Sequence, residues 1–211
     1  VYYIWYSLCY NNLDKVIMSN PSFISIYDNI ITEDECKSII KEFEDSEKFH
    51  KEGKTNNQVW EDIKKSTDLG FNIADNTLTS NIICSALSKG IKKYKETYPT
   101  VDFIIDPWRC TSKYNVQKYN PNEGFFMEHC ETGGLKTAHR VLVWMFYLNT
   151  LKEGGTVFPH YNLVTDAVQG RLVIWPPYWT HIHKGQISKT EIKYIATGWF
   201  EFDPTQKSIE W

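Results

Sequence analysis

The chain of 211 residues is long enough for one domain with a well-formed core and too short for two comfortable ones. Apolar residues make up 42% and aromatic residues 15% of the sequence, which excludes a disordered chain. A net charge of −3 excludes a chain-wide basic field, so we expect no nucleic-acid partner. The five cysteines form no CxxC pair, which favours reduced thiols and an intracellular, cytoplasmic location.

Residues 1–20 begin with an apolar cluster, VYYIWYSLCY, that is well short of the roughly 20 apolar residues of a membrane span. No positively charged segment or small-residue cleavage site accompanies it. Met18 precedes a plausible domain start. We therefore expect 1–20 to be an N-terminal extension outside the core, and 21–211 to be a single domain without a membrane partner.

The first predicted elements are a short strand over 23–28 and a helix that begins at a T-x-x-E capping box, Thr32 to Glu35. Apolar residues then recur at helical spacing: Cys36, Ile39, Ile40 and Phe43. Residues 46–75 are polar and weakly patterned, which predicts a long surface excursion bordering a substrate site. A second helix is predicted from about Ser80 to Tyr98, with a buried stripe of Ile83, Leu87, Ile91 and Tyr94.

After Pro107 the sequence changes to runs of β-branched and aromatic residues separated by Gly, Asn and Pro. Five such runs predict strands, at 113–119, 140–149, 154–160, 170–176 and 192–202. Short strands at this spacing favour an antiparallel sandwich or barrel. The sequence therefore predicts a mainly β chain with N-terminal helices (α+β), with helical support over about 21–106 and a jelly-roll body over about 107–203.

The first candidate ligands are His129 and Glu131, which flank Cys130. On an extended segment, residues two apart project from the same face, about 6–7 Å apart, so an imidazole and a carboxylate can converge on one metal ion. Two further histidines, His181 and His183, follow about fifty residues later. Two imidazoles and one carboxylate suit Fe(II) and leave coordination positions open. On a regular strand His181 and His183 share a face, so alternation does not decide between them.

Lys193 begins the strand IKYIATGWFEF, whose alternation places Lys193, Ile195, Thr197 and Trp199 on one face. A lysine at the start of an apolar strand is costly to bury without an anion, although it could also reach water from the strand end.

From Tyr119 to Trp199 the chain resembles the prolyl 4-hydroxylase-like branch of the Fe(II)/2-oxoglutarate dioxygenases. That family has a Tyr, a Gly and H-x-D/E, then R…YLN, GG-T-FP and P-x-G, and finally a His followed ten residues later by Lys and then Trp. The matching residues, in the same order, are Tyr119, Gly124, His129, Glu131, Arg140, Tyr147-Leu148-Asn149, Gly154-Gly155-Thr156-Val157-Phe158-Pro159, Gly170, His183, Lys193 and Trp199.

The resemblance implies a double-stranded β-helix, the family's jelly roll, and a site in six residues. His129, Glu131 and His183 would be the catalytic iron ligands, with His183 selected over His181 by its ten-residue interval to Lys193. Lys193 would bind the distal carboxylate of 2-oxoglutarate, and Tyr119 and Tyr147 would line that pocket and donate hydrogen bonds. Fe(II), 2-oxoglutarate and O2 would be required, with ascorbate in support, and succinate and CO2 would be the co-products.

Glu131 departs from the family, in which aspartate is the commoner carboxylate ligand. Its extra methylene lengthens the arm and adds a rotatable bond, so its placement must be compensated locally. The retained carboxylate disfavours a halogenase, because those relatives lose it to make room for chloride.

Three functions stay open from the sequence. The leading hypothesis is hydroxylation of a prolyl or similar residue in a peptide; the others are the same chemistry on a free amino acid or small metabolite, and a non-catalytic binding module.

Several other residues have simpler structural interpretations. Cys130 is expected to point away from the two ligands, and the cluster Trp175, Tyr178 and Trp179 is expected in the core. Arg140 and Arg171 are expected to pair with carboxylates on neighbouring strands, with contact to substrate as the alternative.

Overall fold

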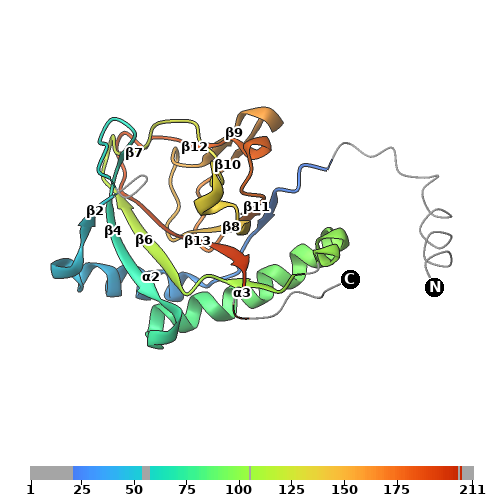
Figure 1. Ribbon diagram of the computed structural model, residues 1–211. Helices are drawn as coiled ribbons and strands as arrows, with labels where there is room; N and C mark the ends of the chain where they lie inside the picture. Colours follow the sequence, from blue (N-terminus) through green and yellow to red (C-terminus); the bar gives the residue numbers. More distant parts are fainter. Residues whose placement is uncertain (1–20, 54–57, 105, 204, 206–211) are drawn as a thin grey trace, which may run out of the picture.

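The computed structural model describes residues 21–53, 58–104, 106–203 and 205, so the expected extension 1–20 lies outside the described residues. Its centre is an eight-stranded antiparallel sheet. Figure 1 shows two helices along one side of this main sheet and a smaller sheet on the other. The layers confirm the mainly β fold with N-terminal helices that the sequence predicts.

The strands come from distant parts of the sequence. The main sheet has the spatial order β1 (Ser25–Tyr27), β11 (Leu172–Trp175), β8 (Arg140–Tyr147), β13 (Lys193–Phe202), β6 (Lys113–Tyr119), β4 (Thr67–Asn72) and β2 (Lys51–Glu52), with β5 (Trp108–Cys110) also paired to β13. The smaller sheet consists of β10 (Leu163–Thr165), β9 (Thr156–Phe158) and β12 (Lys184–Gly185), and β3 (Lys64–Lys65) pairs with β7 (Gly124–Phe125). Short 3-10 turns are η2 (Glu47–Phe49), η3 (Ile73–Asp75), η4 (Pro99–Phe103), η5 (Leu135–Thr137), η6 (Pro159–Tyr161) and η7 (Trp179–His181).

Strand β8 shows why the main sheet is buried on both faces. Its residues after Arg140 are all buried, so the strand has no polar side. Alternate residues enter two different apolar clusters, because successive side chains point to opposite faces of a strand. Leu142, Trp144 and Phe146 face the helices, whereas Val143, Met145 and Tyr147 face the smaller sheet.

Helix α2 (Glu33–Glu44) begins at the predicted capping box, in which Thr32 and Glu35 each accept a backbone N–H from the other. Its buried side chains, Cys36, Ile39 and Phe43, lie on one face and pack into the cluster on the outer face of the main sheet.

Helix α3 (Leu78–Thr97) is capped by Thr77 and confirms the second predicted helix. Gly90 lets the helix lie close to the main sheet, since a Cβ at this position would lie 2.2 Å from Leu172. Of the predicted stripe, Ile83, Leu87 and Tyr94 are fully buried, and Ile91 lies at its margin.

The predicted strands at 113–119, 140–149, 154–160, 170–176 and 192–202 correspond to β6, β8, β9, β11 and β13. The surface excursion expected over 46–75 is wrong in its second half, because β4 pairs along its whole length with β6 inside the main sheet. Leu69 and Phe71 alternate toward the core there. Together with β1, β4 shows that the region expected as helical support also contributes strands.

Candidate active site

The site forms where two segments meet beside the smaller sheet. His129 and His183 form an isolated antiparallel bridge, with N–H to carbonyl distances of 3.0 Å and 2.9 Å. Glu131 follows two residues later, and its backbone N–H donates to Pro177. Its Oε1 lies 3.4 Å from His129 Nε2 and 3.6 Å from His183 Nε2. One ligand atom from each residue therefore lies within 4.8 Å of the others.

Both histidine rings are fixed by backbone carbonyls. His129 Nδ1 lies 3.0 Å from Met127 O, and His183 Nδ1 lies 2.9 Å from His181 O. Because a carbonyl only accepts, each Nδ1 donates its proton, which leaves each Nε2 as the ring nitrogen that faces Glu131. The rings are also packed by aromatic side chains, since Phe125 stacks on His129 at 3.7 Å and Trp175 lies edge-on to His183 at 5.0 Å.

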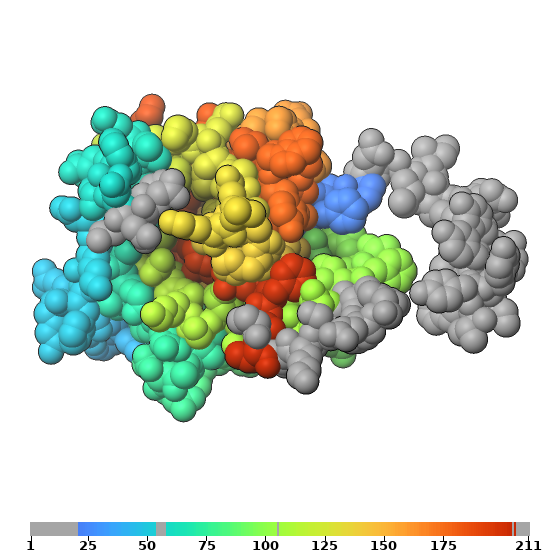
Figure 2. All heavy atoms as spheres, viewed as in Figure 1, coloured from blue at the N-terminus to red at the C-terminus, as the bar shows by residue number. Residues whose placement is uncertain are grey.

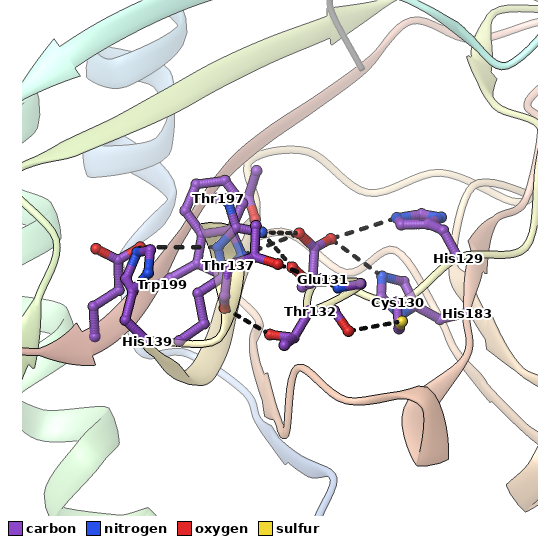
Figure 3. A network of polar contacts seen from close by, with 12 residues as sticks. His129, Cys130, Glu131, Thr132, Thr137, His139, His183, Thr197 and Trp199 are labelled. Atoms are coloured by element: carbon purple, nitrogen blue, oxygen red, sulfur yellow. Dashed lines mark hydrogen bonds and ion pairs between the residues drawn. The ribbon is translucent and has the colours of Figure 1, made fainter. Parts of the chain in front are cut away.

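The carboxyl of Glu131 is held in its ionised form. Burial raises its pKa, but hydrogen bonds and charge from His129 and His183 outweigh burial and hold the pKa well below its usual range. Two imidazole nitrogens and one carboxylate oxygen that face one another fit Fe(II), which takes such a triad and keeps open positions. Figure 3 shows the three side chains pointing toward one another.

His181 points elsewhere. It ends η7, a 3-10 turn, so His181 and His183 do not share the face of a regular strand as alternation predicts. Its Nε2 lies 2.8 Å from Ser22 O and 3.1 Å from the Tyr161 hydroxyl, and its Nδ1 lies 2.9 Å from Thr180 Oγ1. Both ring nitrogens of His181 therefore have partners outside the triad.

Lys193 lies on the inner face of β13, only 7% exposed, directly opposite Tyr119 of β6. Its ammonium lies 5.8 Å from the centroid of the Tyr119 ring and 5.5 Å from that of Tyr147. Burial lowers the pKa of Lys193 to about 8, and among the described residues no carboxylate pairs with it. A buried ammonium without a counter-ion fits a site for an anionic ligand.

The two tyrosine hydroxyls are engaged within the protein. Tyr119 donates to Gln117 Oε1 at 2.7 Å, and the Gln117 amide donates to Asp68 at 3.3 Å. The Tyr147 hydroxyl lies 2.8 Å from both Thr156 Oγ1 and Thr165 Oγ1. Both rings flank Lys193, but their protons have partners in the protein.

The 2OG-Fe(II) oxygenase superfamily model matches residues 114–201, the stretch that contains all six expected site residues. The match covers the β body of the chain, from β6 to β13. The match and the prolyl hydroxylase structures described next identify the protein as a 2-oxoglutarate-dependent dioxygenase, and the match implies Fe(II), 2-oxoglutarate and O2. No curated protein sequence matches the oxygenase significantly.

The oxygenase shares its fold with solved prolyl hydroxylases. The viral collagen prolyl hydroxylase of Paramecium Bursaria Chlorella virus-1, solved with 2OG, is 16% identical with a TM-score of 0.64, covering 89% of this chain and 100% of that chain. A Pseudomonas putida prolyl-4-hydroxylase is 13% identical with a TM-score of 0.63, covering 86% and 94%. A Trichoplax adhaerens prolyl hydroxylase, solved with a hypoxia inducible factor peptide fragment, is 14% identical with a TM-score of 0.70, covering 87% and 85%.

These likenesses confirm the double-stranded β-helix core of the oxygenase and the resemblance to prolyl hydroxylases at the level of the fold. In the described ranges, no helix has both the length and the hydropathy that crossing a bilayer requires.

Sequence reasoning missed the polar groups around the expected site. Lys64 and Asp68 form a shielded ion pair at 2.7 Å, and Gln117 connects Asp68 to Tyr119. The signal for β4, two apolar residues among polar ones, was too weak to place Asp68 near the site. Arg140 is paired with Glu131 and Glu201, and Arg171 with Asp28, which confirms that both arginines meet carboxylates.

Only part of the aromatic cluster expected in the core is buried. Trp175 is buried between the sheets of the oxygenase, but Tyr178 is exposed and Trp179 is 72% exposed. The expectation is wrong for these two, because Tyr178 precedes η7 and Trp179 begins this surface turn, which ends the apolar run. The Cys130 thiol donates to Thr132 O at 3.4 Å and is no part of the triad.

Figure 2 shows one face of the oxygenase hollowed beside the yellow segment, with red atoms of the C-terminal part in its floor. A separate pocket of about 380 Å³ is lined by Glu44, Glu47, His50, Thr67, Lys118 and Asn120. Two of its charged lining residues, Glu44 and Lys118, are paired at 2.8 Å. Its lining contains none of the six expected site residues.

Proposed function

We propose that this dioxygenase hydroxylates a C–H bond of a prolyl or similar residue in a peptide, with succinate and CO2 as co-products. The observation that carries the proposal is the combination of a triad that fits Fe(II) with a buried, uncompensated lysine on the inner face of the same β body. Each feature alone has simpler explanations, but together they provide for a metal ion and a dianionic co-substrate.

In this proposal His129, Glu131 and His183 hold the iron. The backbone carbonyls that accept from each Nδ1 fix both rings with Nε2 facing Glu131. The engagement of both His181 nitrogens elsewhere supports His183 as the second histidine ligand. Bound iron would supply the activation of O2 that couples decarboxylation of 2-oxoglutarate to hydroxylation.

Lys193 is proposed to bind the distal carboxylate of 2-oxoglutarate. An anion placed there would compensate the ammonium that the apolar surroundings destabilise. The rings of Tyr119 and Tyr147 flank the ammonium and restrict water around it. Either hydroxyl would have to turn from its present partner before it could donate to a bound carboxylate.

A peptide substrate is supported by the fold shared with the collagen prolyl hydroxylase and with the enzyme solved with a peptide fragment. The surface near the triad has large exposed apolar side chains, including Phe126, Met127 and Trp60. Phe126 and Met127 lie three and two residues before His129. The carbonyl of Ile63, in the turn that begins at Trp60, accepts the Phe126 N–H. An apolar rim of this kind suits contacts with a peptide.

The test is an assay of iron-dependent succinate release with proline-containing peptides, followed by mass spectrometry for the gain of one oxygen atom. Ascorbate, proposed as a supporting reductant, is included and then omitted. We expect succinate release that requires Fe(II), and no release by Glu131→Ala. Wild-type iron affinity and activity in Glu131→Ala would show that the assigned triad is wrong. Folded wild-type protein without iron-dependent succinate release would instead indicate a binding module.

A further inference from the structure

The two oxygens of the Glu131 carboxylate have different neighbours. Oε1 faces the two histidine Nε2 atoms. Oε2 accepts hydrogen bonds from Trp199 Nε1 at 3.0 Å and from Arg140 at 3.2 Å. Figure 3 shows Glu131 between His129 and His183 on one side and Trp199 on the other. One oxygen is therefore presented to the candidate metal centre, and the other is held by the β body.

Arg140 and Trp199, called the carboxylate clamp below, also hold each other. The guanidinium carbon of Arg140 lies 3.7 Å from the centroid of the Trp199 ring, so the two planes are in contact. Arg140 donates a second hydrogen bond to the backbone carbonyl of Glu131. Arg140 begins β8 and Trp199 lies on the paired strand β13, so the register of the main sheet fixes both donors.

A glutamate ligand needs such donors more than an aspartate does. Its additional methylene adds a rotatable bond, and a free carboxylate can offer a cation one oxygen or both. Binding through both oxygens would use a coordination position that a facial triad leaves open. Donors that engage Oε2 oppose both the rotation and the two-oxygen mode.

We propose that Arg140 and Trp199 are positioning residues that make Glu131 a one-oxygen metal ligand; this inference rests on the metal centre proposed above. The clamp provides the local compensation that the longer arm of Glu131 requires, because the far oxygen is docked on β8 and β13 while the near oxygen reaches the histidines. Glu131→Asp retracts the carboxylate by one methylene, so it cannot reach the clamp and the histidine nitrogens together.

The test uses Co(II) as a spectroscopic probe, titrated into the purified protein while affinity and the d–d absorption spectrum are recorded. The clamp variants are Trp199→Phe, Arg140→Gln and Arg140→Lys. Matched controls are Trp179→Phe, at an exposed tryptophan, and Arg171→Lys, at an arginine paired with Asp28 at 2.6 Å. We expect the clamp variants to bind Co(II) about 10- to 100-fold more weakly, with altered spectra, and the controls to stay within about twofold of wild type.

A double-mutant cycle separates positioning from general weakening of the site. Glu131→Asp is expected to lower Co(II) affinity in the wild-type background and to cost clearly less in the Trp199→Phe background, where the clamp is already broken. Strictly additive losses would overturn the proposal.

The remaining outcomes distinguish the clamp from the metal centre. Wild-type affinity and spectrum in folded clamp variants would overturn the positioning role and leave the metal centre in place. A folded wild-type protein that binds no Co(II) would overturn both. Thermal unfolding of each variant identifies loss of folding, and Arg140→Lys, which keeps the charge but not the planar fork, decides the result if Arg140→Gln does not fold.

Discussion

The two faces of the main sheet are packed very differently. On the face that meets α2 and α3, the buried side chains are apolar or aromatic, and the Tyr114 hydroxyl lies 3.1 Å from Ser80 Oγ. On the opposite face, Lys193 and Gln117 lie among the apolar residues that surround the triad. The outer face supplies stability through burial. The inner face gives up part of that stability to hold polar groups, as is expected of a functional site.

The largest expected effect is a difference in metal binding between variants of two neighbouring histidines, His183 and His181. His183→Ala should abolish metal binding and 2-oxoglutarate decarboxylation, because it removes one of the three proposed ligands. His181→Ala should keep iron, since its nitrogens bond to Ser22, Tyr161 and Thr180. Fe(II) titration and uncoupled succinate release measure both variants. The reverse result would transfer the ligand role to His181.

Substitution of one buried phenylalanine on each side of the main sheet compares the two faces, because both substitutions should lower the free energy of unfolding by a similar amount. Phe43 of α2 is buried on the outer face of the main sheet, and Phe158 is buried near the His183 ring, at 5.5 Å between ring centroids. Replacing either by Ala should lower the free energy of unfolding by about 3–5 kcal/mol. Only Phe158→Ala should also weaken metal binding. Denaturant unfolding and metal titration measure the two effects, with exposed Phe103→Ala as the control; equal metal affinity in both variants would remove the distinction.

The charged side chain of Lys193 should lower the free energy of unfolding when no anion is bound. Its pKa is lowered by burial from 10.5 in the unfolded chain to about 8, so folding disfavours the charged form. The cost is fully present below about pH 8 and disappears as the pH rises through 10.5. Lys193→Met should therefore raise the unfolding free energy at pH 7 by up to about 3 kcal/mol. The exposed Lys113→Met is the control, and a destabilised Lys193→Met protein would refute this assignment.

The same pKa predicts how 2-oxoglutarate affinity depends on pH. Below about pH 8 the Lys193 ammonium is charged before and after binding, so the affinity should be constant. Above it, binding a carboxylate must take up a proton, and the affinity should fall by about tenfold per pH unit. Calorimetry between neutral and alkaline pH measures this fall. A flat profile through this range would show that Lys193 does not meet the co-substrate.

Sequence was most informative where a pattern is strong. The alternating, apolar strands β6 and β13 were predicted almost to the residue, and the capping box fixed the start of α2. The candidate triad could be located because its residues match a family pattern in order, and their geometry is compatible with it.

The features that were missed depend on contacts between distant segments. Strand β4 has only Leu69 and Phe71 as buried apolar residues, so local patterning did not distinguish it from a loop. The turn η7 separates His181 from His183 and ends the assumed alternation. The hydrogen bonds of Arg140 and Trp199 to Glu131 follow from the register of β8 with β13, which no local spacing shows.

The dissociation constant of 2-oxoglutarate, measured without O2 on the Fe(II)-loaded protein, tests most directly whether the inner face is a co-substrate site. We expect one 2-oxoglutarate to bind per chain. In Lys193→Ala the binding should be at least about tenfold weaker with unchanged iron affinity, because losing one partner of a shielded charge pair costs about 2–5 kcal/mol. Equal dissociation constants in the two proteins would contradict the account and assign the carboxylate to another cation, such as Arg140 or Arg171.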